Sequence, residues 1–124
     1  MLLDSNVVIY AFDPAYPQVA DFFVGKTFRV SLITRLEVLG YHRLSQRDSD
    51  RFTQFFNTLD TIAVAADVIE CAVGLRRSRS MGLADAIIAA TCIVYDLSLV
   101  TSNVRDFSWI DGLNIIDPLR YTKT

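Results

Sequence analysis

Five polar residues of this 124-residue chain stand next to short apolar segments, where they could act together: Asp4, Glu37, Asp85, Asn103 and Asp106. Four of them are carboxylic acids. Carboxylates that converge repel one another unless one is protonated or a cation lies between them. Oxygen ligands without His or Cys favour a hard ion, Mg²⁺ or Mn²⁺. The residue types therefore predict an acidic metal site, provided that the fold brings them to one place.

Strand-like and helix-like segments alternate along the chain and must position these residues. Apolar or β-branched runs predict strands at 2–3, 28–33, 61–64, 97–101 and 113–116, and helical spacing of apolar residues predicts helices at 6–12, 18–24, 34–43, 48–59, 67–78 and 85–95. This alternation predicts an α/β fold: one domain over residues 1–124, with a central parallel sheet of about five strands and helices on both faces.

The polar residues fall at one edge of that predicted sheet. Asp4 ends the first strand, and Glu37 lies in the first turn of the helix after the second strand. Asp85 begins the helix before the fourth strand, which Asn103 and then Asp106 follow. Ligand sites in such folds lie beyond the carboxyl ends of the strands, where helices begin. We therefore expect all five residues at the same rim.

Each residue also has a purely structural interpretation. Asp4 could cap the following helix, and Asp85 could complement a helix dipole. Thr34 and Glu37 have capping-box spacing with Thr34 as the N-cap, and a glutamate turned back toward the N-cap amide would point away from a metal. Asn103 could be a turn residue, and Asp106 could be a solvated acid in a loop.

The charge pattern bears on nucleic acid binding. The net charge of −2 counts mildly against such binding. However, ten of the 12 basic residues are Arg, which binds phosphate through two hydrogen bonds. Arg76, Arg77 and Arg79 form a tight basic cluster that could lead phosphates toward Asp85, or could simply be a solvated helix end that complements its dipole. The single His excludes a metal-free ribonuclease mechanism with two imidazoles.

Nothing in the sequence predicts a membrane segment. The longest uncharged run, Ala86–Tyr95, is much shorter than the roughly 20 residues that cross a bilayer. The N-terminus has neither the basic nor the apolar region of a signal peptide. We therefore expect a cytoplasmic protein with no membrane partner.

Four segments, in order and across the whole chain, resemble one family. Leu3–Asn6 is similar to its opening Asp-Thr-Asn signature, with Ser5 in place of Thr. Ser31–Gly40 is similar to its Ser-x-x-Thr-x-x-Glu motif, Leu83–Ala90 to its Asp leading an Ile-Ala-rich helix, and Leu99–Phe107 to its Val-Thr-x-Asn-x-x-Asp-Phe motif. Together they resemble PIN domains of the VapC toxin type.

The resemblance implies a Mg²⁺- or Mn²⁺-dependent endoribonuclease, a toxin neutralised by a small antitoxin and commonly a homodimer. It makes Asp4 and Asp85 metal ligands, directly or through water, with Glu37 beside them. Asn103 would orient water or phosphate. Because Asn103 stands where many PIN domains carry a fourth Asp, either Asn103 or Asp106 could complete the site, for one metal ion or two. A non-catalytic interaction module and a housekeeping RNA-processing nuclease are the alternatives.

Overall fold

Five short strands, each followed by a helix, form one sheet in the computed structural model, which describes residues 1–123. They are β1 (Leu2–Leu3), β2 (Arg29–Ser31), β3 (Asp60–Ile62), β4 (Leu99–Val100) and β5 (Ile115–Ile116). Their order across the sheet is β3-β2-β1-β4-β5, and every neighbouring pair is parallel. The predicted α/β fold with a five-stranded parallel sheet is confirmed.

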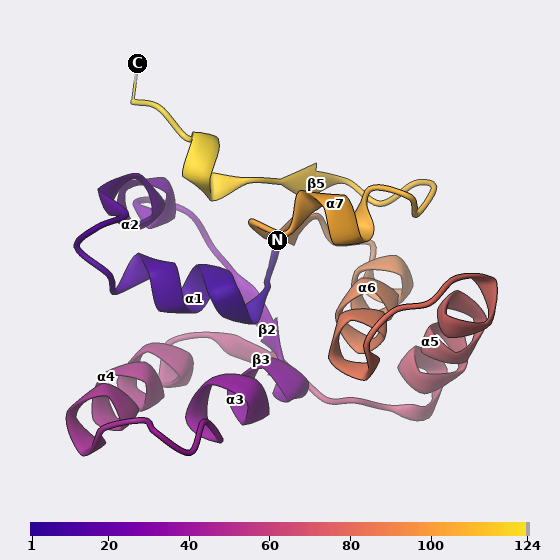
Figure 1. The fold of residues 1–124 in the computed structure, drawn as a ribbon, viewed down its shortest axis with the longest axis horizontal. Coiled ribbons are helices and arrows are strands. Elements are labelled where there is room, and N and C mark those ends of the chain that lie inside the picture. Colours follow the sequence, from indigo (N-terminus) through magenta and orange to yellow (C-terminus); the bar gives the residue numbers. More distant parts are fainter. Residues whose placement is uncertain (124) are drawn as a thin grey trace.

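Seven α-helices and one short 3₁₀ helix accompany the strands within these residues. They are α1 (Ser5–Ala11), α2 (Pro17–Phe23), α3 (Leu32–Leu39), α4 (Gln46–Asn57), α5 (Ala66–Ser78), α6 (Leu83–Tyr95), α7 (Val104–Phe107) and η1 (Pro118–Arg120). Figure 1 shows α5 and α6 side by side, across the strands from α1, α2 and α4. The sequence pattern did not predict α7 or η1, because elements this short carry no periodicity.

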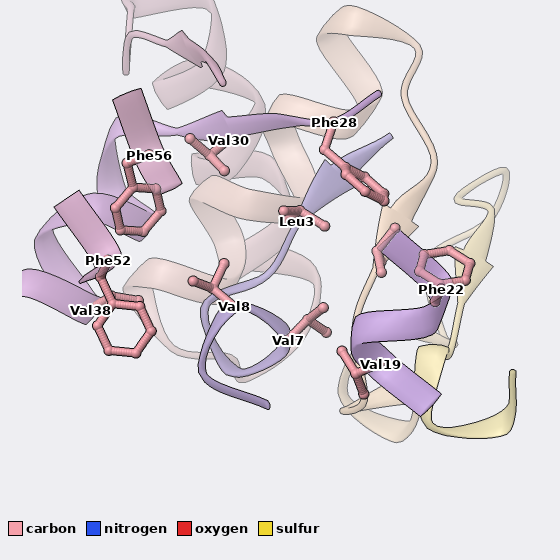
Figure 2. Close-up of a cluster of buried hydrophobic side chains, with 11 residues drawn as sticks. Leu3, Val7, Val8, Val19, Phe22, Phe28, Val30, Val38, Phe52 and Phe56 are labelled. Carbon is pink, nitrogen blue, oxygen red and sulfur yellow. The ribbon is translucent and has the colours of Figure 1, made fainter. Parts of the chain in front are cut away.

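The first face of the sheet packs against α1, α2 and α4. Leu3 of β1 points to this face, where Phe22 of α2 and Phe56 of α4 lie in one cluster of buried side chains (Figure 2). The stripe that includes Phe52 and Phe56 is therefore core, as its helical spacing indicates. This cluster gives β1 and α1, which carry the first polar residues of the site, a rigid support.

The second face packs against α6 and α7. Leu2 and Leu99 point to it, together with Ile88 of α6 and Phe107 of α7, and all four are fully buried. Adjacent residues of β1 thus point to opposite faces, as the pleat of a strand requires. Strands buried on both faces read as continuous apolar runs, and this explains why Leu2-Leu3 shows no alternation.

The strand order places a topological switch point beside β1. The chain adds β2 and then β3 on one side of β1, and returns through α5 and α6 to place β4 on its other side. In open α/β sheets, ligands bind outside the carboxyl ends of the strands at such a point. Of the helices in residues 1–123, none is long and apolar enough to span a bilayer.

Helix α3 begins one turn earlier than predicted. Its N-cap is Ser31, whose hydroxyl accepts the backbone N–H of Ile33 at 3.2 Å, and not Thr34. Thr34 is instead a fully buried residue inside the helix, so the predicted capping box is wrong. Ser31 is an equally good cap and is the last residue of β2, which leaves Thr34 no role at the helix end. Glu37 is consequently free of the N-cap.

Candidate active site at the carboxyl edge of the sheet

Asp4 is held by hydrogen bonds where β1 meets β4. Its backbone N–H donates to the Val100 carbonyl at 2.9 Å, which continues the pairing of the two strands by one residue. One carboxylate oxygen accepts the backbone N–H of Ser5 at 2.8 Å, and the other accepts the Thr101 hydroxyl at 2.7 Å. Only 3% of Asp4 is exposed. Asp4 therefore does cap α1, as its structural interpretation held, and it also faces the end of β4.

Burial and charge act together on Asp4. Desolvation raises the pKa of this carboxyl, and the charge of Asp106 raises it further. The hydrogen bonds from Thr101 and Ser5 lower the pKa of Asp4 but do not cancel the rise. Thr101 also accepts the backbone N–H of Asn103 at 3.0 Å, so one hydroxyl orders both Asp4 and the start of the α7 segment.

Glu37 reaches the same edge from α3. Because α3 begins at Leu32, Glu37 lies in its second turn, not in the first turn as predicted. Partial burial raises the pKa of Glu37, and the charge of Asp4 adds to the rise, while a hydrogen bond from the Ser5 side chain partly offsets it. Ser5 therefore lowers the pKa of both Asp4 and Glu37.

Asp85 feels the charge of all three other carboxylates. It is the third residue of α6 and is half-buried. Desolvation, and then the negative charges of Asp4, Asp106 and Glu37 in that order, raise the pKa of Asp85 to about 6. The four acids predicted from the sequence are thus close enough to repel one another.

Asn103 and Asp106 lie at the start of the segment that follows β4. Asn103 is the N-cap residue of α7, and Asp106 is the third residue of that helix; both are exposed. They line a hollow of about 640 Å³ together with Arg105 and Arg120. Asp106, and not Asn103, carries a charge that acts on Asp4 and Asp85.

The four carboxylates have no basic partner in the part of the chain that the structure describes. The ion pairs between residues 1 and 123 join Arg51 to Asp48 and Lys123 to Asp21, and neither involves the site. An uncompensated group of oxygen donors fits a hard divalent cation. Over the same residues, no three acidic, imidazole or thiol groups are close enough to enclose an ion by themselves.

The structure separates the predicted arginine cluster. Arg79 lines a hollow of about 370 Å³ together with Asp85, Asp106 and Trp109. Arg76 and Arg77 belong to the last turn of α5 and line a different, largely apolar hollow between α5 and α6. Two of the three arginines therefore do not line the hollow that Asp85 and Asp106 share.

Three contributors to this edge were not assigned a role from the sequence: Ser5, Thr101 and Arg105. Thr101 contacts Asp4 only because the register of β1 on β4 sets the two residues side by side, and strand register is not visible in a sequence. Arg105 lines both hollows next to Asp106. Arg105 was not identified from the sequence because the helix that positions it, α7, was not predicted.

Comparison with known proteins agrees with this fold. Residues 1–113 match the model of the PIN domain family. The chain belongs to the PIN domain family. No curated protein sequence matches it significantly.

Solved structures share the fold of this PIN domain over nearly the whole chain. A toxin–antitoxin complex from Klebsiella pneumoniae is 29% identical, with a TM-score of 0.80 over 94% of this chain and 96% of that one. FitAcB from Neisseria gonorrhoeae is 20% identical, with a TM-score of 0.82 over 97% and 99%. DNA-bound VapBC from Salmonella typhimurium is 23% identical, with a TM-score of 0.79 over 94% and 96%. The latter two likenesses show the fold alone.

Proposed function

We propose that this PIN domain is a divalent-metal-dependent endoribonuclease that acts as the toxin of a toxin–antitoxin pair in the cytoplasm. The observation that supports the nuclease activity is that the charges of Asp4, Asp106 and Glu37 act on Asp85 and help raise its pKa to about 6, while none of these acids has a basic partner within residues 1–123. Such a group is costly to assemble unless a cation balances it.

The residues of this chain have distinct roles in the proposed reaction. Asp4 and Asp85 would hold the ion directly or through water, and Glu37 and Asp106 would add negative charge around it. Asn103 would orient water or a phosphate oxygen. A bound Mg²⁺ or Mn²⁺ polarises the phosphodiester, lowers the pKa of water and stabilises the charge of the transition state.

Two features of the structure would keep this shell in place. The Thr101 hydroxyl and the Ser5 backbone N–H each hold one oxygen of Asp4, so the buried carboxylate cannot rotate freely. The fully buried Leu2 and Leu3 anchor β1 directly before Asp4. Fixed carboxylates of this kind need little reorganisation when the reaction begins.

Cleavage of RNA by the purified chain tests the nuclease proposal. We expect a labelled single-stranded RNA to be cut in Mn²⁺ or Mg²⁺ and to stay intact in EDTA. Asp4→Asn, purified in parallel, controls for contaminating ribonucleases. Equal cutting by both proteins, or cutting that survives EDTA, would contradict the proposal. A wild-type chain that stays inert in both metals would favour a non-catalytic interaction module.

The toxin role is supported by likeness to the Klebsiella pneumoniae protein, whose structure is a toxin–antitoxin complex. We expect an antitoxin partner encoded next to this chain, and a homodimer of the chain itself. The test is overproduction with and without the adjacent open reading frame, with growth and co-purification as readouts. A chain that cuts RNA in vitro yet leaves growth unchanged when overproduced alone would indicate a housekeeping RNA-processing nuclease instead.

A further inference from the structure

Helix α7 lies between two hollows that share residues. The smaller, about 370 Å³, is lined by Arg79, Asp85 and Trp109 and also by Arg105 and Asp106. The larger, about 640 Å³, is lined by residues that include the same Arg105 and Asp106. Because both exposed side chains belong to both hollows, the two depressions adjoin and form one path across α7.

Arginines stand along the whole of this path. Arg79 lies in the smaller hollow, Arg120 in the larger one, and Arg105 where the two meet. Within residues 1–123 none of the three forms an ion pair, although Asp85, Asp106 and Asp117 line the same hollows. Their guanidinium groups are therefore available for an external anion, and guanidinium matches the geometry of phosphate.

The indole of Trp109 positions the first of these arginines. The Arg79 guanidinium lies over the Trp109 ring, 5.5 Å from its centre. The ring itself is fixed, since its Nε1 donates to the Asp106 carbonyl at 3.0 Å. Stacking of this kind holds a flexible arginine in place while leaving its hydrogen-bond donors free.

The carboxylates on the path restrict what it can bind. Asp117 accepts the backbone N–H of Leu119 at 3.0 Å and caps η1, so it is committed to local structure. Asp85 and Asp106 belong to the site at which the proposed function places a cation. A polyanion would therefore be attracted by the arginines on either side and, apart from Asp117, would meet acids only at the proposed point of cleavage.

We propose that a single strand of RNA crosses α7 along this path, with Arg79 and Arg120 holding phosphates on opposite sides of the acidic site and Arg105 holding one beside it. The inference rests on the proposed function and adds the route of the substrate. Hollows of these sizes fall in the range of small-molecule sites, which suits single nucleotides of an unpaired strand. Contacts to phosphates alone give binding that tolerates many sequences.

The chain supplies a matched control. Arg77 is also an arginine near the end of α5, but it lines the apolar hollow between α5 and α6 together with Ile69 and Val73. An Arg77→Gln variant removes the same charge as Arg79→Gln, two residues away in sequence. The net charge of the protein is then equal in the two variants, so a difference between them reports position.

The experiment measures binding of a fluorescent oligouridine to the full chain in Ca²⁺, over a range of salt concentrations. Arg79→Gln, Arg105→Gln and Arg120→Gln should each weaken binding about 3- to 10-fold and reduce the log–log salt slope by about 0.7. Arg77→Gln should match the wild type. Trp109→Leu should reproduce the Arg79→Gln loss and add nothing in the Arg79→Gln background, whereas Trp109→Phe should retain most binding. Thermal melts confirm that each variant folds.

The outcomes separate this inference from the proposed function. Unchanged slopes in all three variants, or an equal loss in Arg77→Gln, overturn the RNA path even if the wild type cuts RNA. Reduced slopes in a chain that cuts no RNA with Mg²⁺ or Mn²⁺ support the path and contradict the nuclease. Unchanged RNA binding together with weaker capture of the neighbouring gene's product would assign the arginines to a protein partner and overturn the inference.

Discussion

Residues of β1 and α1 contribute to two neighbouring regions of the molecule that differ in character: an apolar cluster and an edge of carboxylates. Leu3, Val7 and Val8 are fully buried in a cluster of apolar side chains (Figure 2). Asp4, between them in sequence, is almost as inaccessible, but its charge acts on Glu37 and Asp85 and the charge of Asp106 acts on it. The cluster removes apolar surface from water and stabilises the fold. The carboxylate edge costs stability, and such a cost persists where it serves a function.

The largest effect should come from removing one carboxylate at the edge. Asp4→Asn and Asp85→Asn should each lower RNA cleavage in Mn²⁺ by about 1,000-fold, on the order of 4 kcal/mol, because each removes negative charge that would hold the cation. Both variants should remain folded, since Asn has nearly the shape of Asp. Asp111→Asn, an exposed acid outside the site, is the matched control. Wild-type rates in both site variants would refute the metal site.

A substitution in the core cluster should lower stability and leave activity unchanged, the reverse of the carboxylate variants. Phe52→Ala should lower the free energy of unfolding by about 3 kcal/mol, near the lower end for a buried Phe because Phe52 is 7% exposed. Cleavage per folded molecule should stay unchanged. The measurement is urea unfolding beside the cleavage assay, with Gln54→Ala on the exposed face of the same helix as control. Loss of activity in fully folded Phe52→Ala would show that the two regions are coupled.

Thr101 follows Val100 of the core cluster and donates to Asp4, so its substitution should have an intermediate effect. Thr101→Val removes the donor to Asp4 and should slow cleavage about 10-fold, on the order of 1.4 kcal/mol, without changing charge. Thr101→Ser keeps the hydroxyl and should recover most of the rate. A purely structural role predicts instead that both variants melt earlier and cut at the same rate, which would argue against Thr101 as a positioning residue.

The sequence predicted the features that depend on local pattern. Apolar runs and helix periodicity placed the strands and the longer helices, and the parallel topology then brought Asp4 and Asp85 to one edge. Features that depend on side-chain direction were not predictable in this way. Ser31 and Thr34 are both acceptable caps, and only the end of β2 selects the first.

The arginines illustrate the same limit. Arg77 and Arg79 are neighbours in sequence, but α5 ends at Ser78, and the backbone at Arg79 is extended. The chain therefore turns Arg79 toward Asp85 and leaves Arg77 on the helix. A cluster in sequence was divided by a single helix end, whose exact residue no pattern fixes.

The smallest effect is the pH dependence of stability that the carboxylate edge imposes. The pKa of Asp85 is about 6 in the folded chain against an ordinary value of 3.8, so the folded state binds a proton more tightly than the unfolded state. Stability without metal should therefore fall as pH rises from about 4 to 6 and stay reduced above that range. After a discount for solvent at this half-buried group, we expect a loss of about 1 kcal/mol, or about 4 °C in melting temperature.

Asp85→Asn should remove this contribution, so that in EDTA at pH 7 it melts above the wild type and the gap closes by pH 4. Asp111→Asn should follow the wild-type curve. A melting-temperature difference between Asp85→Asn and the wild type that widens toward low pH would mean that a partner stabilises the Asp85 carboxylate. The contrast between a stabilising apolar core and a destabilising carboxylate edge would then be wrong.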